Sequence, residues 1–328
     1  MLFRSQTLFG SIDAFALLAV PFFIYAGELM GRGSVAQRLV DAVQAGVGNV
    51  RGSLGVTTVG TSAIFGAISG VSAATVATVG RIMVPAMRRA NYPEHFSAGL
   101  ITAVGAIDVI IPPSVPMIVY GVAAQESVPR LYAAGIVPGL LIGLMLALYV
   151  VWYARRAGIP GGAPFNTGRF LTALRRGLWA LGAPVIILGG IYGGVFSPTE
   201  AAAVACVYAA LVTRFIYREL SWRDIVAAAS QTAYFTAQIL IVVACASIFA
   251  WLLTVNQVPA ALVGWLGALE LSTWQVLLAL NLLLLLVGCF IDPLSAILIL
   301  TPLLMPIDRK STRLNSSHVS ESRMPSSA

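Results

Sequence analysis

The run FGAISGVSAATVATVG occupies residues 65–80, within a stretch of 29 residues (52–80) that carries no charge. About 20 apolar residues suffice for one membrane-spanning helix. The middle of this stretch reads Ser69-Gly70-Val71-Ser72, which has the small and hydroxyl residues of a turn, and Ser72 is suited to cap a following helix. The pattern therefore predicts a hairpin that enters and leaves the membrane on the same side.

The composition of the whole chain agrees with a membrane location. Of its 328 residues, 58% are hydrophobic and only 10% are charged, and the mean hydropathy is +0.88. Soluble domains have about 25% charged residues. The composition excludes a water-soluble enzyme, a disulfide-stapled secreted module and a disordered chain. It predicts an all-α polytopic membrane protein, surrounded by lipid and with no nucleic-acid partner.

Further apolar segments flank the hairpin on both sides. They cover residues 12–30, 96–124, 132–154, 178–196, 200–217, 232–255, 274–290 and 294–307, and a shorter one covers 258–269. The loop between the apolar segments 132–154 and 178–196 carries five Arg and no acidic residue over residues 155–176. Under the positive-inside rule, this loop is expected to face the cytoplasm.

Two more segments interrupt otherwise good membrane helices. Residues 110–116 read IIPPSVP, so Pro112, Pro113 and Ser114 fall where a helix cannot continue. Residues 290–295 read FIDPLS, which places an acidic residue and a Pro between two apolar runs. Irregular backbone is tolerated in lipid only where protein or a water-filled cavity surrounds it. A structural kink is the alternative interpretation of each Pro.

Asp108 and Asp292 lie at membrane depth in this scheme. An ionisable group there is energetically costly and usually faces a polar pathway, so both are candidate functional residues. The hairpin break precedes the Pro-Pro break by about 40 residues, and the break at Asp292 starts the same order again. Paired interrupted segments in two halves indicate a transporter with its binding site at the repeat interface.

No enzyme chemistry is visible in the sequence. There is no H-E-x-x-H or G-x-S-x-G motif, and no His in any apolar segment. The three Cys lie in apolar runs, as buried hydrophobic side chains do. We therefore expect neither an enzyme nor a bound cofactor.

The last 21 residues (308–328) read DRKSTRLNSSHVSESRMPSSA and differ from everything before them. Their seven Ser and lack of an apolar run are typical of a segment that does not pack. The segment resembles translated adaptor sequence from an unfinished assembly, and a disordered cytoplasmic tail is the alternative. Residues 1–307 are expected to form the membrane transport domain.

Six blocks of the chain match a known family in its order. They are DAFALLAVPFFIYAGELM (13–30), FGAISGVSAATVATVGRIMVPAM (65–87), IIPPSVPMIVYGVA (110–123), AGIVPGLL (134–141), YGGVFSPTEAAAVACVYA (192–209) and GCFIDPLSAILILTPLLMPI (288–307). The chain resembles the large permease subunit (DctM-like) of tripartite ATP-independent periplasmic (TRAP) transporters of the C4-dicarboxylate type. The resemblance covers essentially all of residues 6–307.

This resemblance implies an elevator-type transporter with inverted repeats, re-entrant hairpins and broken helices, in the bacterial inner membrane. It implies sodium-coupled import of a small organic anion such as a C4-dicarboxylate. The implied partners are a periplasmic solute-binding protein, which delivers the substrate, and a small membrane subunit. Carried onto this chain, the implied sodium-binding residues are Ser69, Gly70, Ser72 and Thr75 in the first half, and Asp292, Ser295 and Thr301 in the second. The implied substrate path includes Asp108, Pro112, Pro113 and Ser114.

Several departures from the family pattern limit this transfer. Family members usually begin with a further span and end with a TPP segment and more helices, so we expect this chain to be truncated at both ends. Val71 stands where a Ser is common, and Asp108 stands where a Gly is usual. A carboxylate on an anion path argues against a simple dicarboxylate substrate. A standalone ion-coupled organic-anion transporter and a non-transporting membrane scaffold are the alternative functions.

Overall fold

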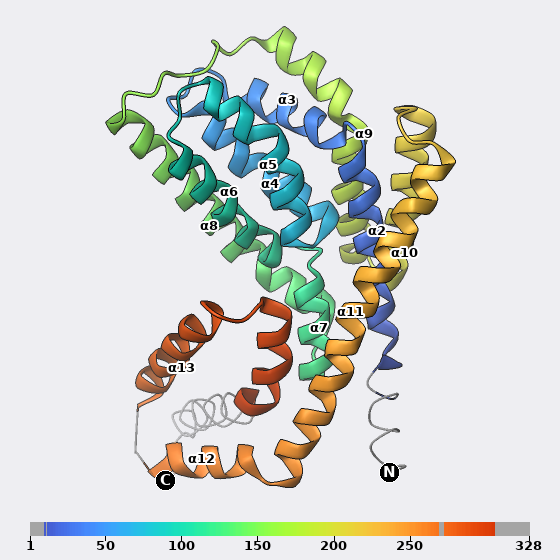
Figure 1. The fold of residues 1–328 in the computed structure, drawn as a ribbon, viewed down its shortest axis with the longest axis vertical. Coiled ribbons are helices and arrows are strands. Elements are labelled where there is room, and N and C mark those ends of the chain that lie inside the picture. The colour runs from blue at the N-terminus through green and yellow to red at the C-terminus, as the bar shows by residue number, and fades with distance from the viewer. Residues whose placement is uncertain (1–9, 11, 269–271, 306–328) are drawn as a thin grey trace, which may run out of the picture. The chain divides into compact units, whose positions relative to one another are not determined.

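The computed structural model describes residues 10, 12–268 and 272–305, and there the chain is helical (Figure 1). The elements in order are η1 (Phe15–Leu18), α2 (Ala19–Arg32), α3 (Val35–Val47), α4 (Ser53–Ser69), α5 (Ser72–Arg89), α6 (Glu94–Ile110), α7 (Val115–Ala124), α8 (Val128–Arg156), α9 (Thr167–Tyr192), α10 (Pro198–Leu211), the π-helical turn η2 (Val212–Ile216), α11 (Trp222–Val255), α12 (Val258–Ala268) and α13 (Thr273–Gly288). A further helix covers Pro293–Met305. The prediction of an all-α polytopic membrane protein is confirmed.

Five of these helical segments are long and apolar enough to cross a membrane. They are Phe15–Arg32, Val128–Arg156, Thr167–Tyr192, Pro198–Ile216 and Trp222–Val255. A sixth span is possible if α6 and α7 count as one, since they pass the same test together but are bent by 44°. The bend falls at the Pro-Pro pair, as the sequence predicts.

Two predicted boundaries are wrong. Helix α11 begins at Trp222, before the expected apolar segment 232–255. Helix α9 begins at Thr167, well before the expected apolar segment 178–196. The side chain of Asn166 accepts a hydrogen bond from the backbone N–H of Arg169 at 3.0 Å and caps the helix there. The first turns of α9 therefore lie in the Arg-bearing stretch that the hydropathy pattern assigned to a loop.

The described chain forms two compact units, and the larger one comprises residues 15–118 and 127–237. Helices α4, α5, α6 and α8 enclose a core in this unit. Its fully buried members include Val104, Ile107 and Val150, and the ring of Phe96 stacks on Tyr153 with 4.0 Å between centroids. Packing of apolar side chains therefore fixes the helices on which the two breaks of the first half lie.

Helices α2 and α10 pack closely in the larger unit because α10 presents small side chains to α2. Ala201, Ala202, Ala205 and Ala209 of α10 are buried, and the thiol of Cys206 donates a hydrogen bond to the carbonyl of Phe22 at 2.8 Å. The Cys206 side chain thus serves packing, as expected for a cysteine in an apolar run. The same expectation is wrong for Cys245 and Cys289, which are exposed.

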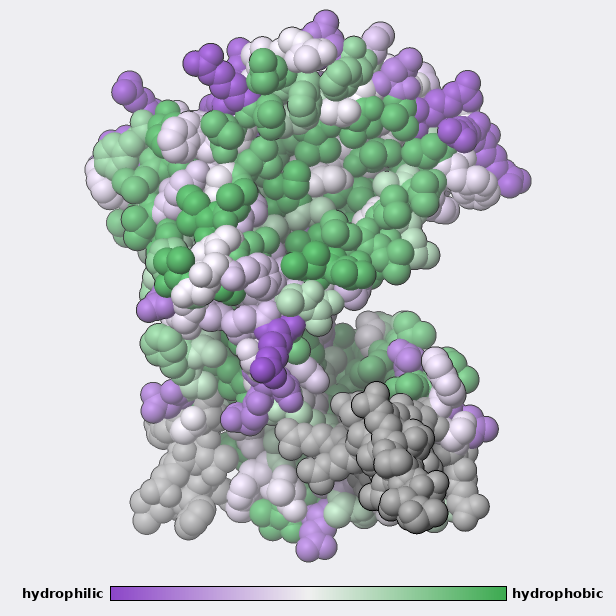
Figure 2. All heavy atoms as spheres, turned by 180° about the vertical axis from the view of Figure 1, so that it is seen from behind, coloured by the Kyte–Doolittle hydropathy of each residue, from purple (hydrophilic) through white to green (hydrophobic). Residues whose placement is uncertain are grey.

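The outer surface of the larger unit fits a lipid environment. Large apolar side chains of α8 are 55–73% exposed along one face, at Val137, Leu140, Leu141, Leu144, Met145 and Leu148. Figure 2 shows apolar side chains covering the flank of this unit and polar ones gathered at one end. In water such a large apolar face would be unfavourable, whereas in a bilayer it contacts acyl chains.

A polar network ties the turn between α2 and α3 to the loop before α11. The Glu219 carboxylate accepts hydrogen bonds from the backbone N–H of Ser34 at 2.6 Å, from the Ser34 hydroxyl, and from the Arg38 guanidinium at 3.0 Å. Arg38 also stacks on the ring of Tyr217, 4.0 Å from its centroid. Partial burial acts to raise the pKa of Glu219, but the hydrogen bonds from Ser34 and Arg38 outweigh burial and lower that pKa below its ordinary value.

Glu219→Gln is expected to lower the free energy of unfolding by about 1–3 kcal/mol near neutral pH, since charge-assisted hydrogen bonds are lost. Because the folded-state pKa of Glu219 is lowered, its contribution is present above the unfolded value near 4.5 and is lost as the pH falls through the folded value. The difference between wild type and variant should therefore vanish in acid. Thermal unfolding in detergent at several pH values measures this difference in stability. A difference that stays constant from neutral to acidic pH would contradict the stabilising role of the Glu219 carboxylate.

Candidate functional site

The predicted hairpin of the first half forms, and its turn is built on Gly70. Helix α4 ends at Ser69, and Gly70 adopts a left-handed conformation with φ +64° while its N–H donates to the Gly66 carbonyl at 2.9 Å. Glycine adopts this conformation without the steric cost that a Cβ brings. Helices α4 and α5 then pack against each other.

The capping role predicted for Ser72 is wrong. Val71 occupies the cap position of α5 in extended conformation, and Ser72 lies in the first turn. The Ser69 hydroxyl instead accepts the N–H of Val71 at 3.4 Å. The turn takes only two residues between helices, so Val71 reaches the cap position before Ser72 does.

Two of the predicted sodium ligands come together at this turn. The hydroxyl oxygens of Ser69 and Thr75 lie 3.2 Å apart, and both side chains are buried. Thr75 is one turn into α5, so the close approach of the two helix ends brings its hydroxyl back to the end of α4. Two hydroxyl oxygens and the free ends of two helices therefore share one small volume.

The second break separates α6 from α7 at Pro112 and Pro113. Ser114 is fully buried, its hydroxyl donates to the Val109 carbonyl at 2.6 Å, and the same oxygen accepts the N–H of Met117 at 3.4 Å. The Ser114 side chain thus bridges the end of α6 and the start of α7. It holds the bend by satisfying backbone groups that the prolines leave unpaired.

The two breaks meet in the folded chain. The N–H of Val115 donates to the Gly70 carbonyl at 3.1 Å, and a Cβ on Gly70 would lie 2.9 Å from the carbonyl oxygen of Pro113. The hairpin turn and the Pro-Pro bend are therefore in direct backbone contact. This arrangement concentrates unwound backbone in the interior of the larger unit, as in transporters that bind ions and substrates at broken helices.

Asp108 lies beside this junction. Its side chain has no solvent exposure, and neither carboxylate oxygen has a hydrogen-bond partner in the part of the chain that the structure describes. The carboxylate packs against Gly66 of α4, where any Cβ would collide with it. The Thr75 side chain is close enough to interact with the carboxylate, although without good hydrogen-bond geometry.

Glycines that sequence reasoning missed make this close packing possible. A Cβ on Gly27 of α2 would lie 2.7 Å from both the Cα and the Cβ of Ser69, so α2 closes one side of the junction. Gly66 makes room for Asp108 in the same way. Nothing in the sequence distinguishes either glycine from others in a helix. Their role becomes visible only from the residues that they contact, Ser69 and Asp108.

Helix α4 also carries buried hydroxyls that the sequence reasoning passed over. Thr57, Thr61 and Ser62 are buried, and the oxygens of their side chains have no hydrogen-bond partner in the described structure. The sequence feature that could have revealed these residues is the series of Thr and Ser side chains within the uncharged stretch 52–80. Ser62 is one helical turn before Gly66 and shares its face, so this face is polar and incompletely satisfied.

The predicted residues of the second half lie in the smaller unit, which includes residues 238–305 of the described chain. Figure 1 shows α13 and the helix Pro293–Met305 joined as a helical hairpin. The carboxylate of Asp292 accepts the N–H of Ser295 at 3.1 Å, so it caps the helix that Pro293 begins. Thr301 is buried further along this helix. Asp292 and Ser295 are brought together, and no contact joins Thr301 to either of them among the described residues.

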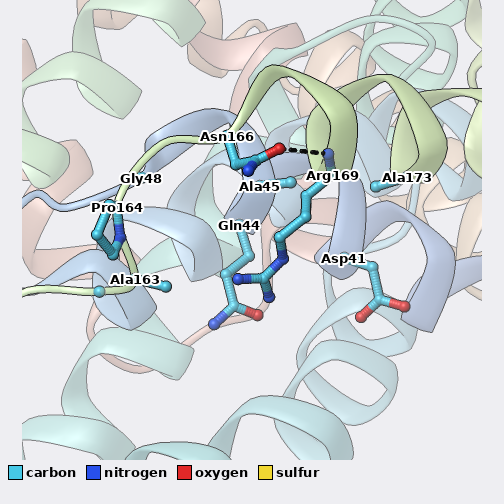
Figure 3. Close-up of a pocket in the computed structure, with 10 residues that line it drawn as sticks. Asp41, Gln44, Ala45, Gly48, Ala163, Pro164, Asn166, Arg169 and Ala173 are labelled. Atoms are coloured by element: carbon cyan, nitrogen blue, oxygen red, sulfur yellow. Dashed lines mark hydrogen bonds between the residues drawn. The ribbon is translucent and has the colours of Figure 1, made fainter.

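A polar pocket of about 220 Å³ lies between α3 and α9, away from the predicted residues. Figure 3 shows Arg169 of α9 reaching into it between Gln44 and Asp41 of α3. Its lining comes from α3 and from the Arg-bearing stretch over residues 155–176. None of the lining residues belongs to the broken helices of the first half.

The fold and the junction define a class of protein: a polytopic helical membrane protein whose interrupted helices meet in its interior. Residues 2–312 match the family described as tripartite ATP-independent periplasmic transporter, DctM component. The chain belongs to this family.

Named relatives cover nearly the same part of the chain. It is 42% identical to the C4-dicarboxylate TRAP transporter large permease protein DctM of Pseudomonas aeruginosa, over 92% of this chain and 70% of that protein. It is also 42% identical to the ectoine TRAP transporter large permease protein TeaC of Halomonas elongata, with the same coverage. The isethionate TRAP transporter permease protein DctMQ of Oleidesulfovibrio alaskensis is 42% identical, and the chain spans 48% of its length.

Proposed function

We propose that this chain is the substrate-translocating part of a secondary transporter that imports a small organic anion together with sodium. The observation that carries the proposal is the backbone contact between Gly70 and Val115, which joins two interrupted helices beside buried hydroxyls. Membership of the family, whose relatives are named as large permeases of TRAP transporters, supports transport over a scaffold role.

Sodium is proposed to bind at the two hairpins. In the first, the ligands would be the hydroxyls of Ser69, Ser72 and Thr75 with backbone oxygen near Gly70. In the second, they would be Asp292, Ser295 and Thr301. The chemistry of the first set fits, because hydroxyl and carbonyl oxygens are ligands that hard cations prefer and because Ser69 and Thr75 are buried together.

The substrate is proposed to pass along Pro112, Pro113 and Ser114, with the transport domain moving in an elevator-like manner in the bacterial inner membrane. A periplasmic binding protein would deliver the anion, and a small membrane subunit would pack beside this chain. The named substrates of the relatives are C4-dicarboxylate, ectoine and isethionate. A small organic acid is therefore the substrate class we propose.

Transport by the assembled system tests the proposal. With the binding protein and small subunit reconstituted in liposomes, uptake of a radiolabelled organic acid is expected only with an inward sodium gradient. Ser69→Ala should reduce the initial uptake rate at least about tenfold at low sodium, because one ligand of the coupling ion is removed. Ser127→Ala, at the start of α8, serves as a matched control and should leave the rate unchanged. Uptake that depends on ATP with no ion gradient would refute the proposal.

A further inference from the structure

Asp108 is a buried carboxylate that forms no ion pair and no well-aligned hydrogen bond within the part of the chain that the structure describes. It lies near the end of α6, on the side that packs against α4 and α5, and its side chain is fully shielded from solvent. An ionised carboxylate in such a place loses its hydration, which is unfavourable unless another charge compensates it. Asp108 is therefore either protonated or compensated by a positive charge.

The helices packed on α6 do not supply that charge. Helix α4 carries no charged residue. On α5, Arg81 donates to the Ala77 carbonyl, Arg88 pairs with Glu94 and Arg89 is exposed. On α8 the charged side chains are exposed as well, at Arg130, Arg155 and Arg156. Among the described residues, no ion pair involves Asp108.

Two hydroxyl groups lie on the hairpin side of the carboxylate. The Thr75 side chain is within interaction range of Asp108, and the Thr75 hydroxyl lies 3.2 Å from that of Ser69. Gly66 has no side chain and leaves the space that the carboxylate fills. One negative charge and two hydroxyls gathered out of reach of water form a donor set for a hard cation.

We propose that Asp108 provides the charged ligand of a sodium site, with Ser69 and Thr75 as its neutral ligands, at the junction of α4, α5 and α6. This inference rests on the proposed sodium coupling and deepens it. The first hairpin would then hold its cation through a full charge in addition to hydroxyl and backbone oxygens. Asp108 would belong to the ion site rather than to the path of an anionic substrate, which its charge would repel.

Sodium-dependent stability of the purified chain tests the site without any transport assay. The midpoint of thermal unfolding in detergent is measured as NaCl replaces choline chloride at constant ionic strength, so that charge screening stays fixed. The wild-type midpoint should rise with sodium, because a ligand that binds the folded state stabilises it. Asp108→Asn should raise the sodium concentration for half of this shift at least about tenfold, since ligand charge tunes cation affinity.

Matched variants make the result specific. Asp41→Asn removes an exposed carboxylate of α3 outside the site and should leave the sodium response unchanged. Thr75→Ala should weaken the response, and it decides the question if Asp108→Asn does not fold. An unchanged response in Asp108→Asn or in Thr75→Ala, or no response in the wild type, would overturn the proposal. A normal response to sodium together with sodium-independent uptake would instead contradict the proposed coupling and leave the binding site intact.

Discussion

Replacing Gly70 by Ala is expected to lower the free energy of unfolding by about 2–4 kcal/mol. A residue with a Cβ loses about 1–2 kcal/mol in the left-handed conformation that Gly70 adopts. The new Cβ would also lie 2.9 Å from the Pro113 carbonyl oxygen, which belongs to backbone and cannot rotate away. The variant must therefore separate the hairpin turn from the Pro-Pro bend, and the hydrogen bond from Val115 to Gly70 is lost with that contact.

Gly158→Ala is the matched control for this prediction. Gly158 also has a positive φ, +67°, but a Cβ there would meet nothing within 4 Å. The control should show the cost of the backbone conformation alone, about 1–2 kcal/mol. Thermal or denaturant unfolding in detergent compares the two variants. Equal losses would show that the junction between the breaks adds nothing to stability.

Gly27→Ala is expected to cost about 1–3 kcal/mol, the usual range for overpacking a dense interior. Gly27 lies inside α2, where Ala normally stabilises a helix by up to about 1 kcal/mol. Its Cβ, however, would lie 2.7 Å from the Cα and Cβ of Ser69, and both atoms are held by the end of α4. To relieve this clash, α2 and the end of α4 must move apart, so the positions of Ser69 and its hydroxyl should change as well.

The comparison for Gly27 is Gly99→Ala in α6, where a Cβ would meet nothing within 4 Å. That variant should be neutral or slightly more stable, because only helix propensity acts. Unfolding midpoints of both variants in the same detergent give the difference. A Gly27→Ala protein as stable as Gly99→Ala would show that α2 does not press against the hairpin.

Much of the local structure could be predicted from the sequence. The absence of charge over residues 52–80 and the Ser-Gly turn predicted the hairpin, and Pro112 and Pro113 predicted the bend between α6 and α7. These features depend on neighbouring residues, because glycine conformation and the missing N–H of proline act within a turn or two of chain. The start of α9 was missed because a polar side-chain cap overrode the hydropathy pattern.

The roles of individual site residues were harder to predict from the sequence. Ser72 looked like a cap in the sequence, yet Val71 takes that position, and Ser114 proved to be a bridge between two helix ends. Asp292 likewise caps a helix in the structure, and its proposed role in sodium binding stays a prediction. A serine or aspartate at a break has several possible partners, and sequence spacing does not choose among them.

By itself the sequence determined the class of protein, the broken helices and their positions along the chain, because hydrophobicity, missing charge and helix breakers act locally. Only the tertiary structure decided that the turn at Gly70 meets the bend at Pro113, that Gly27 presses on Ser69, and that Asp108 lies unpaired beside Thr75. These contacts join residues far apart in the chain. They depend on how closely helices approach, which is set by the packing of whole helix faces and by the glycines that those faces bring together.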